Sequence, residues 1–279
     1  MRSVYRLGAV VPEALPAESI EEAIAYWRRD DPAVAIASGS HAPPTEAELG
    51  EIFGPFLDTV RPRLTVNLAG ADDFDTVGRT SRGTAVEINR CLRGAEAVVC
   101  LGSVEPHYFA GWTGGRKSLV PGLCSLETMR LNHRLAIEGG APGRLEECPV
   151  HLDLMEGTAL VGTWLGEERC ELLGVNVIHH GGHFYGLSSS PLLSTVDELV
   201  PRGMQVYGRR LESRSPVVVC LVEPPLDRDL YQALKAFENW KSAVAPGGVL
   251  LPIRHHERLS SPPGQFAGCD GAAPGWRNG

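Results

Sequence analysis

The stretch EPHYFAGWTGGRK (Glu105–Lys117) carries most of what this sequence indicates about its fold. It places a histidine, an aromatic pair, three glycines and an Arg-Lys pair within thirteen residues. The apolar run Ala97–Leu101 precedes it and predicts a buried strand. A buried strand that leads into a glycine turn is typical of α/β proteins, in which ligands bind beyond the carboxyl ends of strands.

The composition limits the classes of function. The chain has 279 residues, of which 43% are hydrophobic and 22% charged, as in a globular protein with one large or two ordinary domains. A formal net charge of −8 argues against nucleic acid or an anionic membrane as the main partner. No run approaches the roughly 18 apolar residues of a membrane span, and no signal peptide is expected at the N-terminus. Seven widely spaced cysteines without a Cys-x-x-Cys motif predict reduced thiols and a cytoplasmic protein.

Two regions of α/β pattern predict two domains. Residues 1–213 are expected to form an N-terminal catalytic domain with a mixed sheet, and residues 214–279 a second, apparently truncated βαβ domain. The Pro- and Gly-rich tail after Leu251 lacks apolar periodicity, which favours an altered C-terminus. The expected helices span residues 19–28, 46–53, 126–137 and 229–243; the expected strands span 33–37, 64–68, 84–89, 97–101, 159–165, 174–179, 217–222 and 247–251.

The lysine window allows three interpretations. Gly114 and Gly115 permit a tight turn whose backbone N–H groups, with Arg116 and Lys117, would bind an anion such as phosphate. Alternatively, the glycine turn only carries a solvated basic pair. The aromatic residues before it favour a third hypothesis, in which Lys117 is held away from water and made nucleophilic for covalent chemistry.

Histidines accompany this lysine at three positions. His41 and His107 each follow the end of a predicted strand, so the pair could remove and return a proton on opposite sides of a substrate. For either one alone, a structural role is the simpler interpretation. His133 lies in a predicted helix, where a single histidine is usually structural.

Two further patterns have weaker implications. His179, His180 and His183 resemble a metal site, but they flank Gly181-Gly182, which predicts an exposed hairpin end that could at most bind metal adventitiously. Gln232 and Lys235 share one face near the start of a predicted helix and could hold a carboxylate, or they could be an ordinary solvated face.

Taken together, these motifs resemble the nickel-pincer lactate racemase family over residues 33–251. The resemblance rests on Ser-Gly-Ser-His41, on His107-Tyr-Phe-Ala-Gly-Trp-Thr-Gly-Gly-Arg-Lys117, on Asn132-His133 and on Tyr231-Gln232-x-x-Lys235. It implies racemisation or epimerisation of a small 2-hydroxy acid such as lactate, by hydride transfer to and from the cofactor nickel pyridinium-3,5-bisthiocarboxylic acid mononucleotide. Enzymes that make this cofactor are the implied protein partners.

The resemblance also implies a role for each residue. Lys117 would carry the cofactor through a thioamide, His133 would complete the nickel coordination, and His41 and His107 would be the acid/base pair. Soft sulfur donors with an imidazole suit nickel. The remaining residues would line the ligands: Gly114 and Gly115 the cofactor, and Tyr231, Gln232 and Lys235 the substrate.

The chain departs from the family pattern near its N-terminus. The family has an Asp-x-Thr-Arg-Pro motif there whose arginine contacts the substrate, whereas Ser3–Pro12 has neither acidic residue nor arginine in the matching place. An alternative is therefore a degenerate member that binds the cofactor, or a phosphate ligand, without turnover.

Overall fold

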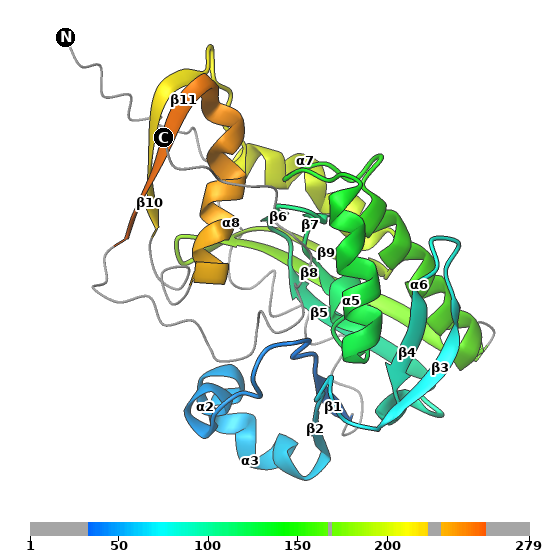
Figure 1. Cartoon of the computed structure of the whole chain (residues 1–279). Helices are drawn as coiled ribbons and strands as arrows, with labels where there is room; N and C mark the ends of the chain where they lie inside the picture. The colour runs from blue at the N-terminus through cyan, green and yellow to red at the C-terminus, as the bar shows by residue number, and fades with distance from the viewer. Residues whose placement is uncertain (1–32, 167–168, 223–229, 255–279) are drawn as a thin grey trace. The chain divides into compact units, whose positions relative to one another are not determined.

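The computed structural model describes residues 33–166, 169–222 and 230–254, which form two compact units (Figure 1). The units divide between Arg209 and Arg210, whereas the sequence predicts a boundary after residue 213. The helix predicted over residues 19–28 and the tail beyond residue 254 lie outside the described residues. The predicted mixed α/β class is confirmed. None of the helices in the described ranges has both the length and the apolar character needed to cross a membrane.

Two short parallel strands and two helices form the first part of the larger unit. The predicted capping box is confirmed, because Thr45 Oγ1 accepts from the Glu48 N–H at 3.3 Å and the Thr45 N–H donates to the Glu48 carboxylate at 2.8 Å. The strands pair with Val34 opposite Leu64. In chain order the elements are β1 (Val34–Ile36), α2 (Glu46–Phe53), α3 (Leu57–Val60) and β2 (Leu64–Val66).

A three-stranded mixed sheet is the centre of this unit. Its strands are β5 (Ala97–Ser103), β8 (Glu171–His180) and β9 (His183–Pro191), with β5 parallel and β9 antiparallel to β8. The predicted hairpin at Gly181-Gly182 is confirmed, and both glycines have the positive φ that a two-residue turn requires. The strand predicted at residues 97–101 is present, but only one of its faces is buried: Val98 and Cys100 are buried, while Leu101 is 66% exposed.

Helix α6 (Pro149–Leu165) corrects one prediction, because the sequence pattern favoured a strand over residues 159–165. Its fully buried side chains Leu154, Thr158 and Val161 lie three or four residues apart, which is the spacing of one helix face. A seven-residue apolar run does not distinguish a strand from the end of a buried helix. Pro149 at the first turn fits a helix start.

The remaining elements of the larger unit surround the sheet (Figure 1). Two of them are antiparallel strand pairs and three are helices. They are β3 (Phe74–Arg79) with β4 (Ala85–Asn89), β6 (Pro106–His107) with β7 (Gly111–Trp112), α4 (Gly115–Leu119), α5 (Leu126–Arg134) and α7 (Thr195–Tyr207).

The smaller unit is a βαβ motif, as predicted. β10 (Ser215–Val222) and β11 (Val244–Arg254) are parallel, and α8 (Leu230–Trp240) connects them. Cys220 and Val222 are buried on one face of the strand pair, packed with Ala233 of the helix and Leu250.

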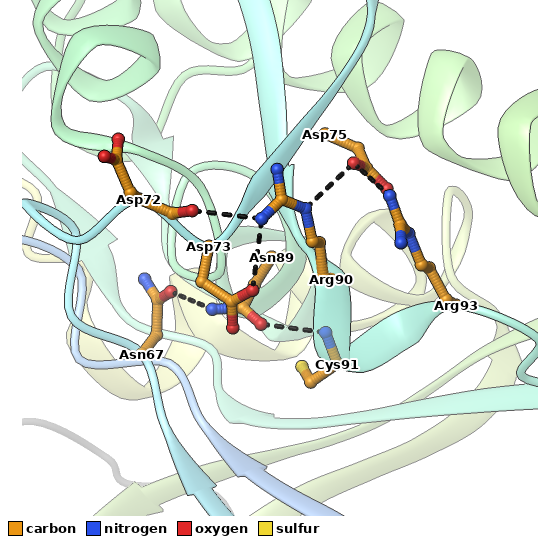
Figure 2. Close-up of polar contacts among 8 residues, drawn as sticks. All are labelled: Asn67, Asp72, Asp73, Asp75, Asn89, Arg90, Cys91 and Arg93. Carbon is orange, nitrogen blue, oxygen red and sulfur yellow. Dashed lines mark hydrogen bonds and ion pairs between the residues drawn. The ribbon is translucent and has the colours of Figure 1, made fainter.

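A polar network ties β2 and β4 to the segment between α4 and α5. Figure 2 shows that the Asn89 side chain donates to Asn67 Oδ1, at 3.0 Å, and accepts from the Cys91 N–H. Asn67 is 1% exposed, and its amide also donates to the carbonyls of Gly122 and Cys124, at 3.0 and 3.2 Å. Nearby, Asp75 accepts from both Arg90 and Arg93, so the start of the β3–β4 hairpin is fixed as well (Figure 2).

We expect Asn67→Ala to lower the free energy of unfolding by about 2–4 kcal/mol, because it removes the acceptor of the buried Asn89 amide and one donor each to the carbonyls of Gly122 and Cys124. Denaturant unfolding followed by circular dichroism measures this change. The control is Glu46→Gln, which removes the exposed ion pair with Arg61 and should leave the midpoint unchanged. Equal midpoints for all three proteins would contradict the structural role of Asn67.

Candidate active site

Three of the predicted site residues meet one aromatic ring, that of Phe109. The His107 ring meets it edge to face with centroids 4.5 Å apart, and the His133 ring does the same at 5.0 Å. Lys117 Nζ lies 6.0 Å from the centre of the ring. We call Phe109, His107, Lys117 and His133 the Phe109 cluster. Its members come from the β6–β7 hairpin, α4 and α5.

His107 ends β6, and two neighbours define the orientation of its ring. Tyr108 stacks on it with centroids 5.0 Å apart, and the Ala110 N–H donates to His107 Nδ1 at 3.3 Å. A ring nitrogen that accepts this bond carries no proton, so the neutral imidazole holds its proton on Nε2. His107 therefore presents an N–H donor on the side away from its own backbone.

Lys117 lies on α4, a five-residue helix held against the sheet. The Gly115 N–H donates to Asn176 Oδ1 of β8 at 2.6 Å. A Cβ on Gly114 would lie 2.4 Å from Val196 Cγ2, and one on Gly115 would lie 2.7 Å from the Cys100 carbonyl oxygen. Close packing on the sheet therefore accounts for both glycines, and their predicted contact with a cofactor stays a prediction.

Arg116 is a structural residue rather than a surface cation. Its side chain is fully buried and donates to the carbonyls of Trp112 and Thr113 and to His151 Nδ1, at 3.0 to 3.1 Å. Burial lowers the pKa of Arg116 to about 10. Burial, with the charge of Arg116 second, lowers the pKa of His151 to about 4, so this imidazole is neutral near pH 7. Arg116 and the Gly115 N–H already donate to groups of the protein. Two of the donors that would bind a phosphate in the anion hypothesis are therefore in use.

His133 is held as a neutral imidazole with one committed nitrogen. Its Nδ1–H donates to the Met129 carbonyl, one helical turn earlier, at 2.7 Å. Burial, together with the charge of Lys117, lowers the pKa of His133 to about 4, and the Met129 bond opposes this shift. A histidine whose Nδ1–H is bound to a carbonyl offers the Nε2 lone pair to a metal.

The turn that carries His41 is joined to the lysine segment by backbone hydrogen bonds. The Gly122 N–H donates to the Lys117 carbonyl at 2.9 Å, and the Gly122 carbonyl accepts from the Gly39 N–H at 3.2 Å. The His41 N–H closes the turn on Ser38 at 3.0 Å. The His41 side chain is exposed, and it lines an open cavity of about 430 Å³ with Gly39, Ser40, Leu68, Ala69, Gly70, Ala71 and Leu126.

Three other predicted residues belong to the smaller unit. Tyr231, Gln232 and Lys235 lie on α8 of the smaller unit, and their role toward a substrate stays a prediction. His179, His180 and His183 are exposed at the hairpin end, as expected. Within the described ranges, no three His, Cys, Asp or Glu side chains are grouped as a metal site. The sequence did not reveal the roles of Asn176 and Asn67, because no local pattern marks a buried amide that caps a distant segment.

Comparison with known proteins supports the family resemblance. The lactate racemase N-terminal domain matches residues 11–142, which include the predicted catalytic residues His41 and His107, the predicted metal ligand His133, and Lys117. The lactate racemases of Thermoanaerobacterium thermosaccharolyticum and Lactiplantibacillus plantarum are each 24% identical, over 78% and 79% of this chain. The chain spans about half the length of these curated relatives, 50% and 51%.

Solved structures show the same fold. The lactate racemase apoprotein from T. thermosaccharolyticum superimposes with a TM-score of 0.66 at 24% identity, covering 78% of this chain and 51% of that one. A protein from Thermotoga maritima superimposes with a TM-score of 0.64 at 15% identity, covering 82% and 60%.

The electrostatics of the cluster can be tested in the cofactor-free protein. We expect His133 to titrate near pH 4 by NMR, and Lys117→Met to raise this pKa because it removes the neighbouring positive charge. The pKa should stay below 6.5 in the variant because burial remains. Arg134→Met, which removes an exposed charge next to His133, should change the pKa little. A wild-type midpoint near 6.5 would contradict the arrangement.

Proposed function

We propose that this chain, which is similar to lactate racemases, racemises or epimerises a 2-hydroxy acid with a nickel-pincer nucleotide attached to Lys117. The observation that supports the proposal most directly is the Phe109 cluster. It gathers a lysine, a neutral histidine with a free ring nitrogen and a second histidine around one ring, although these residues come from three separate elements. The substrate class and the cofactor-making partners belong to the same proposal.

The side chains of the cluster fit the proposed cofactor. Lys117 Nζ provides the amine for a covalent link, and His133 Nε2 provides one nitrogen ligand, since Nδ1 is bound to Met129. Nickel held by sulfur donors of the cofactor needs only this one further donor from the chain. When bound, the cofactor would accept a hydride from the α-carbon of a hydroxy acid and return it. The chain's own contribution is then to hold the substrate and to move the hydroxyl proton.

His107 and His41 are the proposed proton carriers. The Ala110 bond favours the form of His107 with its proton on Nε2, so His107 begins as a donor to the substrate oxygen. His41, on its exposed turn beside the cavity, is the candidate that takes the hydroxyl proton first. For the opposite enantiomer the two roles exchange, which requires the His107 proton to leave Nε2 before catalysis.

The alternative is a family member that holds the cofactor without turnover. It is motivated by the segment Ser3–Pro12, which lacks the aspartate and arginine of the family motif in the matching place. It predicts a cofactor adduct but no interconversion of the enantiomers of any hydroxy acid. Chiral chromatography after incubation with adduct-bearing protein therefore distinguishes it from the proposed racemase.

We expect co-expression with the cofactor-making enzymes to give a protein whose intact mass includes one adduct and which retains nickel in equal amount. Lys117→Ala should have neither, because the amine that forms the link is gone. Lys241→Ala, which removes a surface lysine, should behave as wild type. Wild-type protein without adduct or nickel would refute the proposal.

His107→Gln should lower kcat for racemisation by about 10²–10⁴-fold, the usual effect of losing a positioned acid/base group. Adduct and nickel content should remain, since the proposed link uses Lys117 and His133. His179→Gln changes an exposed hairpin histidine and serves as the control. A His107→Gln variant with wild-type kcat would remove His107 from the proton-transfer role. Chiral chromatography of lactate provides the measurement.

A further inference from the structure

We propose that Phe109 is the positioning residue of this site, whose ring sets the separation and orientation of His107, Lys117 and His133. The consequence for the loaded protein rests on the proposed function. The geometry concerns the chain alone, so the two parts can fail separately.

The Phe109 side chain lies against all three functional groups. The interplanar angle of the Phe109 ring is 81° with the His107 ring and 73° with the His133 ring, so both histidines are met edge to face. Aromatic rings favour this arrangement at the centroid separations observed, 4.5 and 5.0 Å. The ammonium group of Lys117 lies within the roughly 6 Å at which a cation is attracted to a ring face. Removing the ring would therefore release three orientations together.

The backbone of Phe109 is held in place by its neighbours. Its carbonyl accepts from the buried Cys148 thiol at 3.1 Å. The chain at Gly140 passes so close that a Cβ there would lie 2.4 Å from the same carbonyl oxygen. The next glycine of the hairpin, Gly111, accepts from the Gly143 N–H at 2.9 Å. The loop of residues 139–148 thus holds the β6–β7 hairpin in place. A ring on a fixed backbone can in turn restrict the positions of the side chains that pack against it.

A leucine at position 109 would not replace the contacts of the ring. Leucine would fill part of the volume, but it has no planar edge for the two imidazoles and no π face for the lysine. His133 would keep its Met129 bond and His107 its Ala110 bond. Each imidazole would nevertheless lose the ring contact with residue 109 that limits its orientation. The distance between a tether on Lys117 and a ligand atom on His133 would then vary, and small errors of this kind weaken metal binding and catalysis.

The experiment compares Phe109→Leu with Phe109→Tyr, which keeps the ring, and with Phe184→Leu. The last is a control for loss of a phenylalanine ring beside a histidine elsewhere, because the Phe184 ring lies against His179 at the hairpin end in a tilted contact, 5.3 Å between centroids. In the cofactor-free protein, NMR of the imidazole C–H groups reports ring contact directly. Phe109→Leu should shift the signals of both His107 and His133, Phe109→Tyr should keep them near wild type, and Phe184→Leu should shift His179 alone.

In the loaded protein, nickel release to a chelator and kcat complete the test. Phe109→Leu should release nickel at least about tenfold faster and lower kcat by at least about tenfold with a smaller change in KM, and Phe109→Tyr should restore both. If Phe109→Leu does not fold, nuclear Overhauser contacts between the Phe109 ring and both imidazoles in wild-type protein replace the shift measurement.

The outcomes separate the two claims. Unshifted histidine signals in folded Phe109→Leu, or absent ring contacts in wild type, would overturn the positioning role. Shifted signals with wild-type nickel release and kcat would overturn its consequence for the site. If wild-type protein takes up no adduct while the histidine signals shift as expected, the proposed function fails and the positioning role stands.

Discussion

The larger unit depends on the backbone of one residue, Gly122. Its carbonyl accepts both from the Gly39 N–H and from the buried Asn67 amide, and its N–H donates to the Lys117 carbonyl. A side chain would not fit, since a Cβ would lie 2.6 Å from the Ser118 carbonyl oxygen and 2.7 Å from that of Lys117. The turn that carries His41 and the helix that carries Lys117 are thus joined through a single residue. Strands β1 and β2 are a small pair with little core of their own, so this junction, rather than hydrophobic burial, fixes where His41 lies.

A second constraint is electrostatic. Arg116, His133 and His151 are all largely removed from water, and burial lowers the pKa of each. For the two histidines the unfolded chain binds protons first as the pH falls, because its histidines titrate near 6.5 and the folded ones near 4. Proton binding by these two histidines therefore leaves the free energy of unfolding unchanged above about pH 6.5 and lowers it as the pH falls from 6.5 toward 4. The same condition keeps the His133 ring uncharged at neutral pH, which a metal ligand requires.

The elements that could be predicted from the sequence are those with local signals. The capping box of α2, the Gly181-Gly182 hairpin and the βαβ motif each have their signature within a few residues, and each is confirmed. The strand predicted over residues 159–165 was wrong, because these residues form the end of helix α6. A run this short does not show whether its apolar residues follow the period of a strand or of a helix. The site could be predicted as a set of residue types but not as a geometry. The bonds that fix it join residues 55 and 61 positions apart, Asn67 with Gly122 and Gly115 with Asn176, and no sequence pattern marks such pairs. Arg116, for which the sequence allowed either an anion-binding role or a solvated surface position, instead donates to backbone carbonyls.

Under the proposed function, the chain would not need a metal site built from its own side chains. Within the described residues, His, Cys, Asp and Glu are nowhere grouped in threes. A cofactor that brings its own sulfur and carbon donors would need only one nitrogen from the protein, one point of attachment and a fixed distance between them. His133 has a single nitrogen left after its bond to Met129, and Lys117 shares the Phe109 ring with it. The demand on the fold is thus geometric rather than one of ligand number, and a rigid aromatic residue on a clamped hairpin is suited to meet it.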